Sequence, residues 1–334
     1  MPLSISEVEP GMDGTVSGSF PSVTASALCG GAEPMAPEPH AELRAADLLA
    51  WRRSLIKEAG GAAADLDWLL DLAGGLPWPE LQALHLHPQR RVSLSVSLKR
   101  LEELWRRHRR TAEPLQYLVG RCPWRDLELR VGPEVLIPRQ ETEQLVELAL
   151  ALAPQHRELR WADLGTGSGA MAVALAMALP GSPGLAVDAS PAALQLAATN
   201  CRAAAVTERV LLLQSDWWEA LSPWWGELDL VVANPPYIPT ATLHALDPVV
   251  RDHEPWLALD GGSDGLNSLR VISAGAARAL APGGRLLVEH HHDQSEAVLA
   301  LFRASGLEQV EAHHDLEGVK RFASGLRPPT DGTR

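Results

Sequence analysis

The chain has 334 residues, of which 46% are hydrophobic, and a formal net charge of −13. It is long enough for about two domains with sizeable cores, and its acidity argues against a stable nucleic-acid partner, which would need a basic surface. Cys29, Cys122 and Cys201 lie far apart, which excludes a closely spaced metal motif or disulfide framework and favours a reducing, cytoplasmic location.

Residues 1–40 contain neither Lys nor Arg, and Arg44 is the first basic residue. A secretory signal begins with basic residues and a transit peptide is rich in Arg, so neither is indicated. The stretch is acidic and contains many Gly, Ser and Pro residues, which predicts a disordered acidic tail, with Met35 as an alternative start. The longest apolar run, residues 170–179, is too short to cross a membrane, and residues 328–334 are predicted to form a short tail.

Residues 41–112 have apolar residues at helical spacing, interrupted by glycine pairs at 60–61 and 74–75. The pattern includes Leu48, Leu49, Trp51, Leu55 and Ile56. A further helix, predicted over residues 97–110, carries six Lys and Arg residues. We interpret these basic residues as a solvated helix face, with a docking face for an acidic partner as the alternative.

Residues 113–134 are predicted to link this helical segment to the rest of the chain. Loose alternation from Trp124 to Val131 indicates a strand or hairpin. Pro133 and Pro138 bracket a connector, after which Glu141 begins an amphipathic helix. Its first turn is acidic, which suits the positive end of a helix dipole.

From residue 159 onward, strand-like runs alternate with apolar helical stretches. The runs are residues 160–164, 185–187, 210–213, 228–233, 285–289, 307–313 and 319–323. This alternation predicts an α/β fold with a mostly parallel sheet covered by helices on both faces.

A glycine-rich turn, "DLGTGSGA", follows the first of these strands and precedes a helix. Gly165, Gly167 and Gly169, with Thr166 and Ser168 between them, allow the backbone to approach a ligand closely. Asp188 ends the next strand, where a carboxylate can accept hydrogen bonds from ribose hydroxyls. The pattern is shared by nicotinamide dehydrogenases and methyltransferases, so it leaves the cofactor open.

The fourth strand ends in Asn234-Pro235-Pro236-Tyr237. The two prolines make a stiff turn. In it, the Asn234 side-chain oxygen and the Pro235 carbonyl are two acceptors that suit a planar –NH₂ group. Tyr237 supplies a ring for stacking. Such a cradle would favour a pyramidal, nucleophilic nitrogen and stabilise its developing positive charge. Hydride transfer needs no such cradle, so methyl transfer is favoured.

Together with "DLGTGSG" and "AVDAS", the Asn-Pro-Pro-Tyr motif resembles the amino-methyltransferases that use S-adenosylmethionine. Six segments in order extend the resemblance over residues 41–326 to the HemK/PrmC family of release factor glutamine methyltransferases. They are "EPLQYLVG", "VLIPRQETEQLVE", "LLQSDWW", "VVANPPYI", "HEPWLALDGGSDGL" and "LAPGGRLLVEH".

This resemblance implies a Rossmann-like, seven-stranded class I methyltransferase domain at residues 135–327. A helical substrate-docking domain at 41–112 and a β-hairpin linker at 113–134 would precede it. It further implies methyl transfer from S-adenosylmethionine, leaving S-adenosylhomocysteine, to the side-chain amide of the Gln in the Gly-Gly-Gln motif of class 1 peptide-chain release factors.

The same resemblance implies roles for individual residues. Gly165 to Gly169 would surround the methionine part of the cofactor. Asp188 would hold the ribose, and Asp216 and Trp217 would line the adenine. Asn234, Pro235, Pro236 and Tyr237 would receive the glutamine, with Asn234, Pro235 and Tyr237 catalytic and Asn234 also next to the cofactor.

The sequence departs from the family pattern in its connector. Gln140 and Glu141 stand where the family usually has Pro and Asp, and Trp124 stands where Phe is frequent. These differences concern partner docking more than cofactor chemistry.

Two other functions stay open at this point, an adenine N6-methyltransferase acting on nucleic acid and a non-catalytic cofactor-binding module. A metal site at His290-His291-His292 is not expected, because consecutive residues of a strand point to opposite faces.

Overall fold

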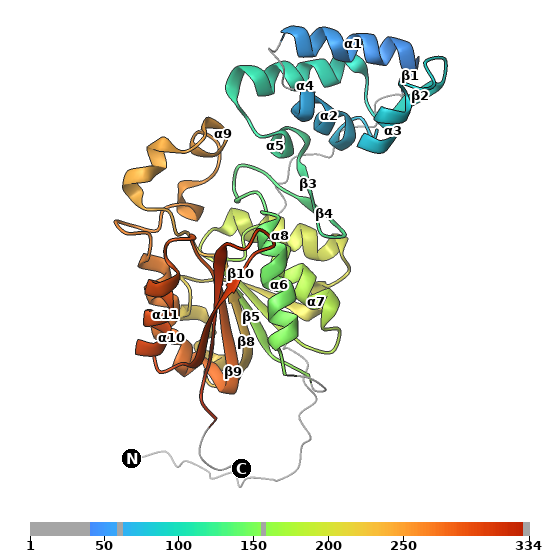
Figure 1. The fold of residues 1–334 in the computed structure, drawn as a ribbon. Helices are drawn as coiled ribbons and strands as arrows, with labels where there is room; N and C mark the ends of the chain where they lie inside the picture. Colours follow the sequence, from blue (N-terminus) through green and yellow to red (C-terminus); the bar gives the residue numbers. More distant parts are fainter. Residues whose placement is uncertain (1–40, 59–62, 155–157, 330–334) are drawn as a thin grey trace, which may run out of the picture. The chain divides into compact units, whose positions relative to one another are not determined.

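A computed structural model describes residues 41–58, 63–154 and 158–329 (Figure 1). The predicted tail at residues 1–40 lies outside the described residues, as do residues 330–334 of the short C-terminal tail.

Five helices follow one another in the first part of the described chain. They are α1 (Ala45–Glu58), α2 (Ala63–Leu72), α3 (Trp78–Ala83), α4 (Leu98–Thr111) and α5 (Leu115–Val119). The Ser97 hydroxyl caps α4 by accepting a hydrogen bond from the Arg100 N–H at 3.2 Å. Buried leucines from all five helices form one cluster, so the predicted helices are confirmed.

The predicted helical pattern of residues 41–112 was wrong in one respect, because two short strands lie within it. Strands β1 (Ala41–Arg44) and β2 (Arg91–Leu94) pair antiparallel. Each strand has only four residues, too few for a period of two to be distinguished from a helical period in the sequence.

The predicted hairpin is confirmed. Strand β3 (Arg121–Trp124) turns through Arg125, with φ of 53°, into the antiparallel strand β4 (Leu127–Arg130). After the connector, helix α6 (Glu141–Leu152) begins at the residue expected from the sequence.

A seven-stranded sheet with flanking helices follows and confirms the expected α/β class. Its elements are β5 (Trp161–Leu164), α7 (Ala170–Ala178), β6 (Gly184–Asp188), α8 (Pro191–Ala203), β7 (Val210–Gln214), β8 (Leu228–Ala233), α9 (Pro248–Arg251), α10 (Asn267–Ala279), β9 (Leu280–Glu289), α11 (Ser295–Ala304), β10 (Glu308–His314) and β11 (Lys320–Leu326). Short 3₁₀ turns lie at Thr207–Arg209, Glu219–Trp224, Thr240–Ala245 and Trp256–Ala258.

The strand order is β10-β11-β9-β8-β5-β6-β7, and β11 alone runs antiparallel to β9 and β10. Figure 1 shows α6, α7 and α8 on one face of the sheet and α10 and α11 on the other. Each of the seven predicted strands is present. The sequence placed the start of β9 at residue 285, but the strand begins five residues earlier, at Leu280. The added segment is still paired, because the Gly283 N–H donates to the Arg327 carbonyl at 2.9 Å.

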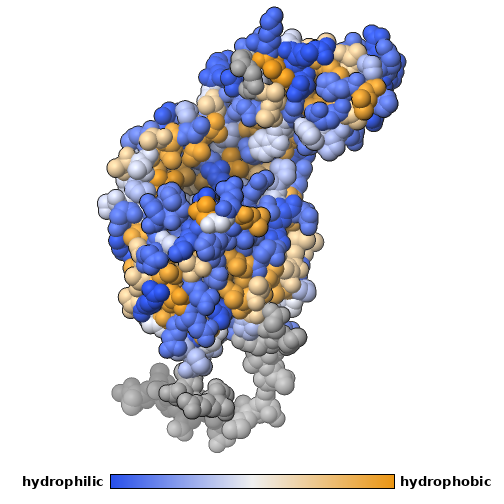
Figure 2. Space-filling view, viewed as in Figure 1, coloured by the Kyte–Doolittle hydropathy of each residue, from blue (hydrophilic) through white to orange (hydrophobic). Residues whose placement is uncertain are grey.

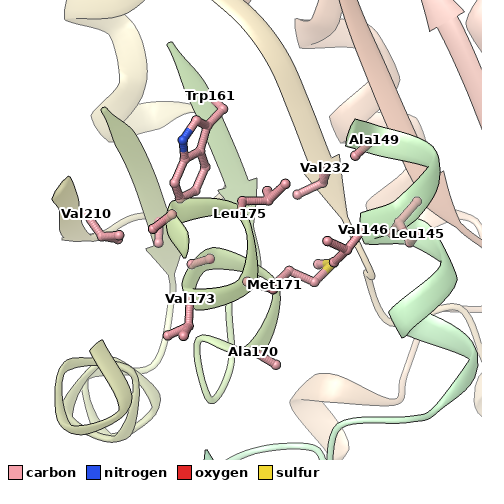
Figure 3. Close-up of a cluster of buried hydrophobic side chains, with 14 of the residues drawn as sticks. Leu145, Val146, Ala149, Trp161, Ala170, Met171, Val173, Leu175, Val210 and Val232 are labelled. Atoms are coloured by element: carbon pink, nitrogen blue, oxygen red, sulfur yellow. The ribbon is translucent and has the colours of Figure 1, made fainter. Parts of the chain in front are cut away.

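The main hydrophobic core lies between the sheet and helices α6 and α7. Seven successive residues of α7, from Ala170 to Ala176, are buried, because this helix is covered by the sheet on one side and by neighbouring helices on the other. In Figure 3 the side chains of Met171 and Val146 point toward each other between α7 and α6. This packing fixes where α7 starts, and therefore where the glycine loop before it lies.

The sheet register brings four strand ends level. Leu164 of β5 pairs with Val187 of β6 and with Ala233 of β8. Ala233 pairs in turn with Val288 of β9. Directly after these four residues come Gly165, Asp188, Asn234 and Glu289. Residues far apart in sequence therefore meet at one edge of the sheet, where α/β proteins bind ligands.

Within the described part of the chain, no helix combines the length and the apolar character needed to cross a membrane.

Gly184 is expected to be required by its cross-strand neighbour. It pairs with the fully buried Trp161, and a Cβ at residue 184 would overlap the indole. Gly184→Ala should lower the free energy of unfolding by about 1–3 kcal/mol, measured by chemical denaturation. The cost should be smaller in a Trp161→Leu background, where the ring is absent. An equal cost in both backgrounds would contradict the clash.

Candidate active site

A cavity of about 480 Å³ lies at the edge of the sheet where the four strand ends meet. Most of the residues predicted for a site line it: Gly165, Thr166, Gly167, Ser168, Asp188, Asp216, Trp217, Asn234 and Pro236. Gly169, Pro235 and Tyr237 are not among the lining residues. The structure thus brings the glycine loop, the acidic strand end and the Asn-Pro-Pro turn around one space.

The glycine loop is held by the neighbouring strand. The N–H groups of Gly165 and Thr166 both donate to the Val187 carbonyl at 2.9 Å. Gly167 has φ of +56°, and a Cβ on it would point into open space. A Cβ on Gly165 would lie 3.3 Å from the Trp217 ring. Because these two residues are glycines, the cavity wall consists there of backbone atoms without side chains.

Gly169 has a different task from the other glycines of the loop. It directly precedes α7 with φ of +81°, and a Cβ on it would lie 3.0 Å from the Ala197 Cβ of α8. Its lack of a side chain lets α7 and α8 approach each other. Gly169 thus supports the site from behind the cavity.

Two carboxyl groups, the partly buried Asp188 and the fully buried Asp163, hold the loop by hydrogen bonds. Asp188 accepts hydrogen bonds from the Gly167 N–H at 2.8 Å and the Ser190 N–H at 2.9 Å. Burial raises the pKa of Asp188, and those N–H groups oppose the rise. Asp163 is fully buried and accepts a hydrogen bond from the Thr166 hydroxyl at 2.6 Å. Burial raises the pKa of Asp163 to about 7; the Thr166 bond opposes this and the Asp188 charge adds to it.

Asp216 and Trp217 come shortly after strand β7 and line the cavity. In the strand order, β5 and β6 separate β7 from β8, the strand that Asn234 follows. The Asp216 side chain is exposed, and Trp217 is half-buried with φ of 49°. A positive φ is rare for a Trp residue, and here it accompanies the contact between its ring and the glycine loop.

Asn234 belongs to a chain of four hydrogen-bonded side chains. Its Nδ2 donates to the Thr142 hydroxyl at 3.0 Å, which in turn donates to the Glu289 Oε2 at 2.7 Å. The Tyr237 hydroxyl donates to the Glu289 Oε1 at 3.1 Å. Glu289 is thus the common end point of two hydrogen-bonded branches.

Burial is the largest influence on the pKa values of the two titratable groups in this network, Glu289 and Tyr237. It raises the pKa of Glu289 to about 7, while hydrogen bonds from Thr142 and Tyr237 oppose the rise. Burial also raises the pKa of Tyr237, with the Glu289 charge as the next cause, so the phenol stays protonated. The protonated Tyr237 hydroxyl can therefore be the donor in its hydrogen bond to Glu289.

The Asn-Pro-Pro turn keeps two acceptors unused. Over the residues that the structure describes, neither the Asn234 Oδ1 nor the carbonyl oxygen of the buried Pro235 accepts a hydrogen bond. Asn234 itself is only partly buried and lines the cavity. An –NH₂ group in the cavity would find the Asn234 oxygen free, while the adjacent Pro235 is not itself among the lining residues.

The connector and the segment after the Asn-Pro-Pro-Tyr turn form another wall. One terminal nitrogen of Arg139 lies 2.8 Å from both carboxylate oxygens of Glu254, whose side chain is 1% exposed. The indole N–H of Trp124 donates to the Arg139 carbonyl at 2.7 Å. Arg139, Trp124 and Pro255 all line the cavity, so this ion pair holds its wall together.

Apolar side chains border this wall on the surface. Leu257, which lines the cavity, is 67% exposed, and the adjacent Trp256 is 43% exposed. In the view of Figure 2, apolar residues are visible on the surface in the region of α9, the helix that precedes the 3₁₀ turn Trp256–Ala258 along the chain.

Sequence reasoning assigned no role to four residues of the site: Arg139, Thr142, Glu254 and Glu289. Glu289 carried one usable signal, a charged residue at the end of the apolar run "RLLVE". Thr142 and Glu254 carried none, because their partners are 147 and 115 residues away in sequence.

The three consecutive histidines lie after strand β9. The argument that strand geometry would point them to opposite faces was therefore wrong. They are outside the strand, and the rings of His291 and His292 are 4.1 Å apart. His291 Nδ1 lies 2.7 Å from an Asp293 oxygen. Among the described residues, no group of three or more His, Cys, Asp or Glu side chains is arranged to hold a metal ion.

Comparisons with known proteins agree with this arrangement. Residues 142–261 match the family model described as "Methyltransferase small domain". The chain is 53% identical to a release factor glutamine methyltransferase of Prochlorococcus marinus over 85% of this chain and 97% of that protein. Proteins of the same name from Gloeobacter violaceus and Thermosynechococcus vestitus are 44% and 40% identical, over 81% and 83% of this chain and 94% and 96% of theirs.

The Arg139–Glu254 pair should stabilise the cavity wall more than an exposed pair could. Arg139→Met would leave a buried carboxylate without its partner and should lower stability by about 3 kcal/mol near neutral pH. Burial already raises the pKa of Glu254, and losing Arg139 removes an opposing charge. The Glu254 carboxyl then takes up a proton more readily as the pH falls, so the loss should be smaller at about pH 5 than at about pH 8.

Thermal unfolding at the two pH values measures this effect. Arg270→Met is the control, because Arg270 pairs with Asp264 on the surface, where an ion pair contributes little. Equal losses in the two variants would contradict a structural role for Arg139.

Proposed function

The chain belongs to the family of release factor glutamine methyltransferases, and from this premise we propose that it transfers a methyl group from S-adenosylmethionine to the side-chain amide nitrogen of a Gln in a peptide-chain release factor. One observation carries the proposal: the Asn-Pro-Pro turn has two unused acceptors, and its Asn234 and Pro236 line the same cavity as the glycine loop and Asp188. The motif expected to hold the glutamine amide and the motif expected to hold the cofactor therefore line the same cavity.

The lining fits S-adenosylmethionine. Gly165 and Gly167 present bare backbone to the cavity, and a side chain on Gly165 would press on the Trp217 ring. We propose that residues 165–169 surround the methionine part, that Asp188 accepts from the ribose hydroxyls, and that Asp216 and Trp217 contact the adenine. Each carboxylate oxygen of Asp188 already accepts one backbone N–H and has a further lone pair for a hydroxyl. When bound, the cofactor supplies an electrophilic methyl group on a sulfonium.

Asn234 and Pro235 would act on the nucleophile. The Asn234 Oδ1 and the Pro235 carbonyl can each accept one N–H of the glutamine amide, which orients its nitrogen. They also stabilise the positive charge that grows on this nitrogen as its bond to carbon forms. The acceptors are fixed in place before the reaction, which is how such groups lower a barrier. The bond between the methyl carbon and the sulfonium would break as the new bond forms, which would leave a neutral thioether, and the nitrogen would release one proton to solvent.

Pro236 and Tyr237 complete the turn in different ways. Pro236 lines the cavity and would form part of the glutamine pocket. Tyr237 is not among the lining residues, and its hydroxyl donates a hydrogen bond to Glu289. Stacking of the Tyr237 ring on the substrate stays a prediction, and a role in supporting the turn is the alternative that this position favours.

The relatives favour glutamine over adenine as the acceptor. An adenine N6-methyltransferase would share the Asn-Pro-Pro-Tyr turn, but the relatives from the three organisms carry the name of glutamine methyltransferases. The formal charge of −13 is also unfavourable for binding a phosphate backbone. A non-catalytic module would have no use for the free acceptors beside an intact glycine loop.

The partner proposals rest on the family. We propose that the Gln lies in the Gly-Gly-Gln motif of class 1 release factors and that residues 41–112 dock the substrate protein. The limits of that domain, of the linker at 113–134 and of the methyltransferase domain at 135–327 stay predictions. So does a cytoplasmic location.

Asp188→Ala should weaken cofactor binding about a hundredfold, because charge-assisted hydrogen bonds to the ribose and to the glycine loop are lost. Calorimetry with S-adenosylhomocysteine measures the affinity. Glu308→Ala, which removes an exposed carboxylate on the edge strand β10, is the control. Unchanged affinity of the Asp188 variant would exclude this residue from the cofactor site.

Asn234→Ala should lower kcat roughly a hundredfold or more, with a smaller effect on KM, because the lost acceptor acts mainly as charge develops. Asn234→Asp keeps an acceptor and should retain part of the rate. Single-turnover methylation of a release factor at saturating cofactor, read by mass spectrometry, measures both. An Asn234→Ala protein with an unchanged single-turnover rate and only weaker substrate binding would refute the cradle.

A further inference from the structure

We propose that Glu289 is a positioning residue, which acts through the Thr142 hydroxyl to hold the Asn234 amide with its oxygen, and not its nitrogen, available to the substrate. The inference rests on the proposed function, since it concerns the same acceptor. It adds two residues, Thr142 and Glu289, that bring about the orientation of the cradle.

The sheet register places Glu289 beside Asn234. Ala233 and Val288 are paired residues of the parallel strands β8 and β9, and the two site residues follow them directly. Thr142 comes from the first turn of α6, which packs over this strand end. Both supporting side chains are secluded from water, with Thr142 5% and Glu289 2% exposed.

The direction of each hydrogen bond follows from what an ionised carboxylate can do. Such a group only accepts, so the Thr142 hydroxyl must give its single proton to Glu289. The Thr142 oxygen is then an acceptor for its other neighbour, which must be the –NH₂ of Asn234. The amide is thereby fixed, and its oxygen remains for the substrate.

A neutral Glu289 would remove this constraint. A protonated carboxyl can donate to the Thr142 oxygen, and the Thr142 hydroxyl can then donate to the Asn234 oxygen instead. The amide would turn over and present two N–H groups to the cavity. A glutamine –NH₂ would meet donors instead of an acceptor, and the reacting nitrogen would lose its stabilisation.

The charged and titratable groups around Glu289 belong to several elements. Glu141 of α6 raises its pKa, and Arg321 of β11 and the Tyr237 hydroxyl lower it, although burial is the largest cause of the rise to about 7. His290 follows it directly, and burial lowers the pKa of that imidazole, which favours a neutral ring. The change between the two amide orientations is thus expected near neutral pH.

The test is the pH dependence of the single-turnover methylation rate, measured on a release factor with saturating cofactor. The wild-type rate should rise with pH through about 7, because the ionised form of Glu289 is the one that orients Asn234. Glu289→Gln keeps the shape but can donate to Thr142. It should be about tenfold slower at high pH and lack the Glu289-dependent rise.

Thr142 offers a matched pair of variants. Thr142→Val removes the hydroxyl with little change in shape and should slow the reaction about tenfold. Thr142→Ser keeps the hydroxyl and should recover most of that loss. Calorimetric affinity for S-adenosylhomocysteine should be similar in both, because the chain of hydrogen bonds ends at the acceptor turn and not at the cofactor loop.

Tyr237→Phe provides an independent readout. It removes one of the two hydroxyl donors to Glu289, which should raise the pKa of that carboxyl further. The rise in rate should therefore move to higher pH, whereas Glu289→Gln abolishes it. A role of these residues in folding alone would produce no such shift.

The outcomes separate the two proposals. No methylation of any release factor by the wild-type protein would overturn the proposed function. An active wild type with the same pH profile as Glu289→Gln would overturn the positioning role and leave the function standing. Equal rates of the Thr142→Val and Thr142→Ser proteins would also overturn it, and a Glu289→Gln protein that fails to fold leaves this Thr142 pair as the deciding test.

Discussion

The level ends of four neighbouring parallel strands are the constraint on which the site depends. In a parallel sheet, hydrogen bonding sets the register residue by residue, so the pairing of Leu164, Val187, Ala233 and Val288 determines which residues come together directly after the strands. A glycine loop, two carboxylates and an amide are consequently collected at one edge. A slip of one residue would turn the side chains of the slipped strand to the other face. Every residue of β5 and β8 is buried, so a slip of either strand would force the packing on both faces of the sheet to change.

Fully or partly buried carboxyl groups are the second feature of this edge. Asp163, Asp188 and Glu289 all have raised pKa values, with burial as the main cause. Each is nevertheless held by hydrogen-bond donors, from backbone N–H groups at Asp188 and from hydroxyls at the other two. A buried carboxyl with donors can stay ionised and can fix the direction of every hydrogen bond that ends on it. Of the three, Asp188 lines the cavity, whereas Asp163 and Glu289 lie outside the lining and hold the lining residues Thr166 and Thr142.

The cavity wall that contains Arg139 and Pro255 is built from segments without long regular structure. The connector before α6 and the segment after the Asn-Pro-Pro-Tyr turn are joined by Arg139 and Glu254, and the Trp124 indole anchors the connector. Loops of this kind are positioned by side chains and not by a backbone ladder, which lets binding surfaces vary on a constant sheet. Gln140 and Glu141, where this chain departs from its family pattern, are exposed and lie in sequence between the lining residues Arg139 and Thr142.

The sequence by itself determined the features that depend on near neighbours. The seven strands, the start of α6 at Glu141, the glycine loop and the Asn-Pro-Pro-Tyr turn follow from apolar runs and from residues that restrict their own backbone. Tertiary structure decided the rest. The pairing of residues 41–44 with 91–94 and the hydrogen bonds of Tyr237 and Thr142 to Glu289 all join residues remote in sequence. The reason is physical: periodicity records which face of an element is buried, whereas sheet register and helix packing decide which distant residue lies against that face.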